Sequence, residues 1–372
     1  MSLNTELNTE LNTELNTELP LFTRYPQIKQ QLSPQQFACL PTPVKALSGL
    51  GSNAWIKQDD LTHPSYGGNK IRKLDFVLAE IKRKKKKHVI TFGATGSNAG
   101  VATAMMCYRN QLKCTVYLFN QPLSQTVKDN LSLMQAYGAE LIYCGSLLKT
   151  VLSFYCSRYR LNKDSYFLWA GCSNSVATFA YINAAFELKQ QIEDGELPEP
   201  EHIFVPVGSC STLAGLTLGA QLSGLKSKII GIRVAPAYLG PFPACTANEV
   251  NKVIKVAAKQ MRDWGIKGLA NIPKCQFNDD FYGDGYGIAS KESLKAIETF
   301  EQQGIVLENT YSGKAAAAYL QQLQHDDSEQ KPQLFWQTFN SVDALSQAQQ
   351  HTDINAASSL SDKLQQYLAN KR

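Results

Sequence analysis

The stretch Tyr66-Gly-Gly-Asn-Lys-Ile-Arg-Lys-Leu-Asp75 decides how the rest of the sequence is interpreted, because a pair of glycines leads into an amphipathic segment. Apolar residues recur at helical spacing from position 71 to position 81, which predicts a helix with Asn69 as its N-cap. Lys70 then lies in the first turn, where the helix dipole disfavours a cation. Such an amine has a lowered pKa and can react at neutral pH. We therefore expect Lys70 to be a reactive residue rather than an ordinary surface lysine.

The amino-acid composition limits the classes of protein to which this chain can belong. The chain has 372 residues, of which 44% are hydrophobic, and this is enough for two domains of ordinary size. The net charge is +5, and the basic run 82–87 is interpreted as a solvated helix end, so no nucleic-acid partner is expected. Nine scattered cysteines and five dispersed histidines predict a cytoplasmic protein with reduced thiols and no metal site. We expect neither a membrane span nor a signal peptide.

The order of candidate elements is typical of a doubly wound α/β fold with mostly parallel sheets. Residues 1–19 repeat Leu-Asn-Thr-Glu and are interpreted as a low-complexity tail without chemistry. We expect a small domain, 84–180, and a discontinuous large domain made of 20–83 and 181–372. Candidate strands are 54–58, 88–93, 114–119, 140–144, 166–169, 202–207, 228–234 and 333–338, and candidate helices are 98–110, 124–137, 146–159, 174–190 and 212–223.

Glycine and hydroxyl side chains gather in three strand-to-helix turns, at residues 92–100, 169–174 and 207–216. Each turn places backbone N–H groups at a helix N-terminus, which favours an anion, and parallel strands bring such turns to one edge of a sheet. One turn of this kind can serve packing alone. Three of them indicate a ligand with more than one anionic group.

The third turn is the best candidate for a phosphate site. Gly208 allows the backbone to approach a ligand closely, and the hydroxyl groups of Ser209, Ser211 and Thr212 surround it. The turn lacks the lysine of a Walker A loop, so a nucleoside triphosphate is not expected. Two later stretches also present aromatic residues, with Tyr286 in the loop 282–287 and Tyr311 beside Ser312 at a helix start. Judged alone, either tyrosine fits a core role as well as a functional one.

Together these stretches resemble the D-cysteine desulfhydrase and 1-aminocyclopropane-1-carboxylate (ACC) deaminase family, whose lysine motif is G-G-N-K-x-R-K-L. The similarity covers residues 35–345 and keeps the order of the motifs. It implies the fold of the tryptophan-synthase β-subunit type, with pyridoxal 5'-phosphate in the cleft between two domains. It also implies a homodimer that acts on a small amino acid.

The resemblance implies roles around the cofactor. Lys70 would attach the cofactor aldehyde, and Lys73 would lie near the phosphate. Asn98 would bond the hydroxyl group of the cofactor ring, and Tyr311 would stack on the pyridine ring. The phosphate loop would consist of Gly208, Ser209, Cys210, Ser211 and Thr212.

On the substrate side, the resemblance implies that Ser97 contacts the substrate carboxylate or relays its proton, and that Tyr286 lies beside the substrate. Ser312 stands where the deaminases carry a glutamate against the pyridine nitrogen, and Thr338 matches a threonine of the desulfhydrases. A hydroxyl is a weaker proton partner than a carboxylate, which suits a substrate whose β substituent departs as a thiolate. These residues favour β-elimination from D-cysteine to pyruvate, sulfide and ammonia, with ACC deamination or another D-amino-acid lyase as the alternative.

Two readings from other classes stay open. Residues 95–102 resemble the glycine turn of short-chain dehydrogenases, and Tyr66 and Lys70 have the Y-x-x-x-K spacing of that family. In a nicotinamide-dependent dehydrogenase the pair follows the turn on a helix, whereas here it precedes the turn and is separated by two glycines. The second reading is a protein that binds the cofactor without turnover, because Ala99 and Phe339 replace a histidine and a glycine of the family pattern. A serine hydrolase is disfavoured because the chain has no G-x-S-x-G elbow.

Overall fold

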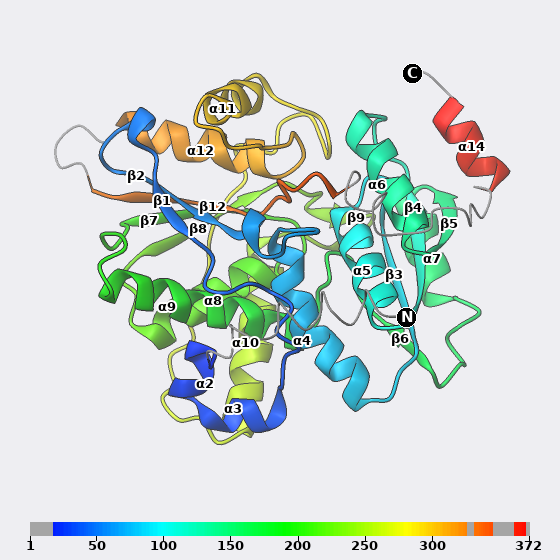
Figure 1. Ribbon diagram of the computed structural model, residues 1–372, viewed down its shortest axis with the longest axis horizontal. Coiled ribbons are helices and arrows are strands. Elements are labelled where there is room, and N and C mark those ends of the chain that lie inside the picture. Colours follow the sequence, from blue (N-terminus) through cyan, green and yellow to red (C-terminus); the bar gives the residue numbers. More distant parts are fainter. Residues whose placement is uncertain (1–17, 326–330, 345–360, 370–372) are drawn as a thin grey trace, which may run out of the picture.

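Two β-sheets, each flanked by helices, make up the two halves of the molecule (Figure 1). The computed structural model describes residues 18–325, 331–344 and 361–369. The larger sheet has the strand order β1-β2-β12-β7-β8-β11, and the smaller sheet has the order β5-β4-β3-β6. Neighbouring strands in both sheets run parallel, except that β1 runs antiparallel to β2. The expected α/β fold with mostly parallel sheets is confirmed.

The strands of the larger sheet are β1 (Val44–Ala46), β2 (Ala54–Gln58), β7 (His202–Val207), β8 (Lys228–Arg233), β11 (Gln276–Asn278) and β12 (Gln333–Gln337). Those of the smaller sheet are β3 (His88–Ala94), β4 (Lys113–Phe119), β5 (Glu140–Gly145) and β6 (Ser165–Phe167), and a separate hairpin joins β9 (Tyr238–Leu239) to β10 (Phe242–Pro243).

The longer helices are α4 (Asn69–Arg83), α5 (Asn98–Arg109), α6 (Gln125–Ala136), α7 (Leu147–Tyr155), α8 (Ser175–Glu193), α9 (Ser211–Ser223), α10 (Ala247–Asp263), α11 (Lys291–Glu301) and α12 (Ser312–His325). Short helices are α2 (Pro20–Arg24), α3 (Pro26–Gln31), α14 (Asp362–Ala369) and the 3₁₀ turns η1 (Ser48–Leu50) and η2 (Asp59–Leu61). No helix among the described residues is both long and apolar enough to cross a membrane.

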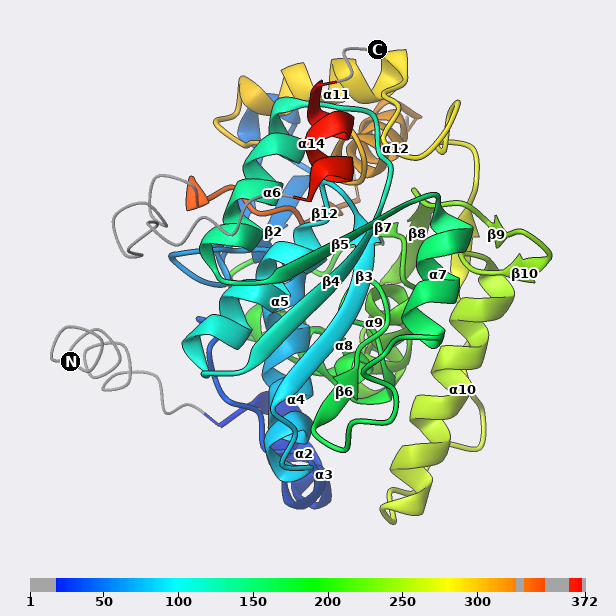
Figure 2. The ribbon, with the colours of Figure 1, turned by 90° about the vertical axis from the view of Figure 1, so that its right-hand side faces the viewer.

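Helices cover both faces of each sheet, which explains why the central strands β3, β7 and β12 are almost entirely buried. Helices α8 and α9 lie on one face of the larger sheet and α12 lies on the other (Figure 1), while α5 and α6 lie opposite α7 on the smaller sheet (Figure 2). All seven residues of β3 are buried, as expected for a parallel strand covered on both faces. Several helices begin at a polar side chain that accepts a backbone N–H group, namely Ser97, Ser124, Ser146, Asn174, Thr246 and Ser290.

The start of α4 differs from the expectation in one detail. Asn69 is the first residue of the helix rather than its N-cap, and Gly68 occupies the capping position without a side-chain cap. The side chain of Asn69 is directed instead at Lys70 and Thr212. The expected low-complexity tail falls outside the described residues except for its last two, of which Leu19 packs into the core.

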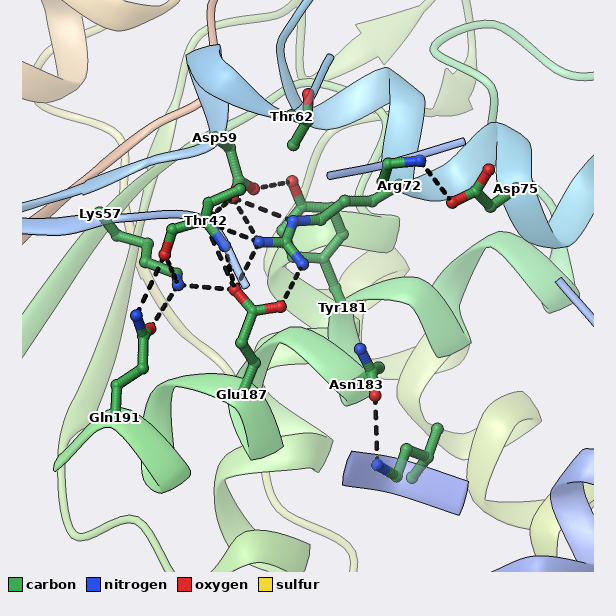
Figure 3. A network of polar contacts seen from close by, with 12 residues as sticks. Thr42, Lys57, Asp59, Thr62, Arg72, Asp75, Tyr181, Asn183, Glu187 and Gln191 are labelled. Carbon is green, nitrogen blue, oxygen red and sulfur yellow. Dashed lines mark hydrogen bonds and ion pairs between the residues drawn. The ribbon is translucent and has the colours of Figure 1, made fainter. Parts of the chain in front are cut away.

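A buried ionic network joins α4 to β2, η2 and α8 (Figure 3). The guanidinium of Arg72 donates to Asp59 Oδ1 at 2.8 Å and to both carboxylate oxygens of Glu187 at 2.8 Å. Lys57 Nζ donates to the same Glu187 at 2.6 Å. These four side chains, two basic and two acidic, are at most 3% exposed, and every charge has an opposite partner. Further hydrogen bonds to the network come from Thr42, Tyr181, Gln191 and Trp336.

Because Arg72 lies on α4 two residues after Lys70, the network fixes the helix start that carries the amine.

Candidate active site

The turn before Lys70 has room for glycine only. A Cβ on Gly67 would lie 1.7 Å from the carbonyl oxygen of Asp60, which is an impossible contact. Gly68 has φ +94°, a backbone conformation that side chains rarely adopt. The chain can therefore turn sharply into α4 and present Lys70 from the first helical turn.

The end of β12 holds this turn in place. The backbone N–H of Asn69 donates to the carbonyl oxygen of Thr338 at 3.1 Å. The backbone N–H of Gly67 donates to Asn340 Oδ1 at 2.6 Å. Thr338, predicted as a cofactor contact, thus meets the lysine turn through its backbone, and Asn340 has a structural role that the sequence did not reveal.

The amine of Lys70 lies 2.5 Å from Asn69 Oδ1 and 5.9 Å from the centre of the Tyr311 ring. Burial lowers the pKa of Lys70, because the low-dielectric surroundings disfavour the ammonium form. The amine is therefore held against an aromatic face in an environment that favours its neutral, nucleophilic form.

One turn further along α4, Lys73 is 1% exposed. Its Nζ contacts the carbonyl oxygen of Gly171 at 3.4 Å, a long hydrogen bond for a buried cation. Burial, followed by the charge of Lys70, lowers the pKa of Lys73 to about 7. A buried ammonium so weakly paired is stabilised by an anion placed beside it.

The second and third glycine-rich turns meet beside Lys73, as predicted. The hydroxyl of Ser173 lies 2.7 Å from that of Ser209 and 2.8 Å from that of Ser211, where α9 begins. A Cβ on Gly171 would lie 2.5 Å from Ser209 Oγ, so only glycine lets the turns approach this closely. Hydroxyl groups and the N-terminus of α9 thus form an anion cradle next to a buried lysine.

Each of these two turns also contains a cysteine in the left-handed backbone region. Cys172 has φ 56° and Cys210 has φ 66°, and both side chains are buried. Residues other than glycine seldom adopt this conformation, and where they do so they cluster at functional turns. Thr212, two positions after Cys210, contacts the lysine motif, because Asn69 Nδ2 donates to its Oγ1 at 3.3 Å.

The first glycine-rich turn lies on the side of the smaller sheet. Ser97 Oγ accepts the backbone N–H of Gly100 at 3.1 Å and so caps α5, which leaves its hydroxyl proton available to a ligand. Asn98 Oδ1 accepts from Asn130 Nδ2 at 2.9 Å and from the Tyr66 hydroxyl at 3.3 Å. With its oxygen occupied, the Asn98 side chain has N–H groups to offer, and Tyr66 links it to the lysine motif.

The two predicted tyrosines face each other. Their hydroxyl groups are hydrogen-bonded, and the rings of Tyr286 and Tyr311 lie 5.8 Å apart at an angle of 86°. Burial raises the pKa of Tyr286 to about 12, so it remains a proton donor at neutral pH. The loop that carries it is held by buried Lys314, whose Nζ donates to the carbonyl oxygens of Tyr282 at 2.5 Å and Gly285 at 2.7 Å.

Ser312 is fully buried at the start of α12 and is paired with a carboxylate. Its Oγ accepts the backbone N–H of Glu308 at 2.9 Å, and its hydroxyl is 3.2 Å from Glu308 Oε1. The same carboxylate accepts the backbone N–H groups of Thr310, Tyr311 and Ser312 at 2.6, 2.7 and 2.8 Å. Glu308 therefore caps the helix that presents Tyr311.

A family model described as "Pyridoxal-phosphate dependent enzyme" matches residues 36–335. The chain belongs to this family. Pyridoxal phosphate is accordingly the cofactor of this pyridoxal-phosphate-dependent enzyme, as the resemblance in the sequence implied.

Solved structures share the fold of this pyridoxal-phosphate-dependent enzyme. A structure of an ACC deaminase homologue superposes with a TM-score of 0.73 at 24% identity, covering 89% of this chain and 100% of the other. Threonine deaminase isoform 2 from Solanum lycopersicum gives 0.60 at 14% identity, covering 89% and 92%. A pyridoxal 5'-phosphate-dependent aspartate racemase gives 0.58 at 19% identity, covering 87% and 95%.

The residues of the enzyme fit this cofactor at both of its ends. The serine cradle, the start of α9 and the poorly paired ammonium of Lys73 would hold the phosphate. At the other end, the amine of Lys70 would attach the aldehyde beside the ring of Tyr311. Among the described residues, no group of three His, Cys, Asp or Glu side chains is arranged to hold a metal ion.

Several residues that hold other site residues of the enzyme in place could not be predicted from the sequence. Asn69 was expected to cap a helix, yet its side chain contacts the Lys70 amine and Thr212. Ser173 and Glu308 lie inside stretches that were recognised, but their own spacing carried no signal. Lys314 follows Ser312 by two residues and gave no reason to expect a contact with the tyrosine loop.

Proposed function

We propose that this enzyme catalyses β-elimination on a small amino acid, with D-cysteine as its substrate. Water and D-cysteine would be converted to pyruvate, ammonia and hydrogen sulfide. The observation that carries the proposal is the hydroxyl group at position 312, at the start of the helix that also presents Tyr311 to the amine of Lys70.

The environment of Ser312 supports a substrate that carries its own leaving group. Its hydroxyl oxygen accepts a backbone N–H group, and its proton is directed toward Glu308. A hydroxyl held in this way is a poor proton donor to a pyridine nitrogen, and the Glu308 carboxylate is itself occupied by three backbone N–H groups. A weakly protonated ring is a weaker electron sink, which is sufficient when a thiolate departs from the β carbon.

The chain would supply the proton transfers and the orientation. When bound, pyridoxal phosphate supplies an electron-withdrawing ring that stabilises negative charge at the substrate α carbon. Lys70, with its lowered pKa, is the base that removes the α proton, and Ser97 holds the substrate carboxylate at the start of α5. Tyr286, whose pKa is raised to about 12, stays protonated and donates to the departing sulfur.

The test is a panel of amino acids incubated with the purified enzyme and pyridoxal phosphate. We expect D-cysteine to yield equal amounts of pyruvate and sulfide, while L-cysteine yields far less. Keto acid from ACC but none from D-cysteine would replace the proposal with a deaminase. A protein that takes up the cofactor and releases no keto acid from any member of the panel would exclude turnover of this class.

A further inference from the structure

The last helix of the described chain packs on the smaller sheet, on the side of the substrate-facing turns. Helix α14 lies near β5 at the outer side of the smaller sheet (Figures 1 and 2). Leu364 is fully buried against the core, and the ring of Tyr367 lies 5.5 Å from that of Tyr143. A cavity of about 530 Å³ lies between the helix and residues 120–123, and Tyr143 and Tyr367 contribute to its lining.

The hydroxyl group of Tyr367 joins two strand-to-helix turns. It donates to the carbonyl oxygen of Gln121, after β4, at 2.6 Å. It also lies 2.8 Å from the hydroxyl oxygen of Thr95, after β3. Because the single phenolic proton goes to the carbonyl, the Thr95 hydroxyl donates to the phenolic oxygen. Thr95 is fully buried, so Tyr367 is a partner that replaces water for this hydroxyl.

Both joined turns face the proposed substrate site. Thr95 begins the turn that places Ser97 and Asn98 at the start of α5. Gln121 packs against the two glycine-rich segments, since a Cβ on Gly96 would lie 3.1 Å from its Oε1 and a Cβ on Gly287 would lie 3.5 Å from its Cγ. Tyr367 therefore contacts Thr95, two positions before Ser97, and Gln121, which packs against the glycine that follows Tyr286.

We propose that Tyr367 is a positioning residue, whose hydroxyl group holds the turn 95–98 in the geometry that binds the substrate carboxylate. That the turn binds a substrate carboxylate rests on the proposed function. The bridge formed by the hydrogen bonds of Tyr367 to Thr95 and Gln121 does not depend on it. The proposal makes the C-terminal helix part of the substrate side of the site. It assigns no contact between Tyr367 and the cofactor or the reacting atoms.

The test uses the full-length enzyme with the variants Tyr367→Phe, Thr95→Val and the double variant. Phenylalanine keeps the ring that packs on Tyr143, and valine keeps the shape of threonine, so folding is preserved. Tyr108→Phe is the matched control, because Tyr108 is a half-exposed tyrosine on α5 whose ring contacts Tyr137. Three quantities are measured: amide hydrogen exchange of residues 94–100, the Kd of pyridoxal phosphate, and KM and kcat for the amino acid turned over.

We expect Tyr367→Phe to speed exchange of residues 94–100 by about fivefold to tenfold, the equivalent of one hydrogen bond, and to raise KM by a similar factor. The cofactor Kd and kcat should change by less than about twofold, and the double variant should be no worse than Tyr367→Phe. A merely structural role would lower the unfolding temperature and leave KM unchanged.

Unchanged exchange of residues 94–100 in Tyr367→Phe would overturn the inference, whatever the activity. Faster exchange in a protein that turns over no amino acid would instead support the bridge and reject the proposed function. The two ideas therefore fail through different measurements.

Discussion

The hydroxyl group of Ser312 lies 3.2 Å from Glu308 Oε1, and the backbone of the same serine donates to that carboxylate at 2.8 Å. The carboxylate thus caps the first turn of α12, and it also accepts the backbone N–H of Tyr311. A charged acceptor for several N–H groups at a helix N-terminus is a strong form of capping.

Replacing Glu308 by glutamine should lower the free energy of unfolding by about 1 to 3 kcal/mol, because a neutral amide accepts fewer of these N–H groups and loses its interaction with the helix dipole. Urea denaturation of the cofactor-free protein measures the loss. Glu301→Gln, at an exposed position on α11, is the control and should change stability by less than about 0.5 kcal/mol. Equal effects of the two substitutions would contradict the capping role.

Replacing Lys70 by alanine should abolish both the visible absorbance of the lysine-bound cofactor and all turnover. Lys82→Ala, at the exposed end of the same helix, should leave both unchanged. Absorbance spectra and keto-acid assays of the two variants provide the comparison. Turnover by the Lys70 variant at the wild-type rate would show that Lys70 is not a catalytic residue.

Lys73 gives the cofactor-free protein a specific dependence on pH. Its pKa is lowered to about 7 by burial and by Lys70, whereas an unfolded lysine has a pKa near 10.4. Between about pH 7 and pH 10 the unfolded chain therefore holds a proton that the folded chain has released, and stability rises with pH. Below about pH 7 both forms are protonated and the contribution is constant.

The measurement is the unfolding temperature of wild type and Lys73→Met from about pH 6 to pH 9.5. The difference between the curves should change with pH without cofactor and flatten when pyridoxal phosphate is bound, because the phosphate stabilises the ammonium form. The variant should also bind the cofactor about tenfold to a hundredfold more weakly. Parallel curves for the two cofactor-free proteins would show that the pKa of Lys73 is not lowered in the folded state.

The buried network behind α4 predicts a large cost for removing one member. Burial alone would raise the pKa of Glu187, but Arg72 and Lys57 outweigh it and hold the pKa well below its usual range. Glu187→Gln leaves two buried cations with one remaining carboxylate, and we expect it to lower the free energy of unfolding by about 3 to 5 kcal/mol. Glu193→Gln, in an exposed pair with Lys189 on the same helix, should cost less than about 1 kcal/mol.

The same variant tests the pH dependence. A lowered pKa in the folded state gives stability that is present above the unfolded pKa, near pH 4.3, and is lost as the pH falls below it. Wild type should therefore lose more stability than Glu187→Gln during acid titration followed by circular dichroism. An identical acid transition in both proteins would contradict an ionised, paired Glu187.

The fold class and the lysine turn could be predicted from local patterns in the sequence. The helix after Gly68 and the alternation of strands and helices follow from residue spacing. The meeting of Ser173, after β6 of the smaller sheet, with Ser209, after β7 of the larger sheet, also depends on how the two sheets pack. β1 and β11 are short edge strands of the larger sheet whose residues are half-buried or exposed, so no apolar pattern marks them, and they were not predicted.

Contacts between distant segments could not be predicted. Arg72 and Glu187 are separated by 115 positions, and nothing near either residue indicates its partner. Tyr367 lies 272 positions from Thr95 and belongs to a helix that the sequence did not single out. Such pairs depend on how the two sheets pack, which the periodicity of single elements does not contain.

The strand order of the larger sheet constrains the order in which its strands can pair during synthesis. β12 lies between β2 and β7, so the last strand of the described chain to be synthesised has to insert at the middle of the sheet. The smaller sheet, complete by Phe167, can form while the rest of the chain is still being made. Residues 338–340, which hold the lysine turn, directly follow β12 and are synthesised after all the other strands of the described chain. The lysine turn of the pyridoxal-phosphate site can therefore reach its final geometry only after β12 has inserted between β2 and β7.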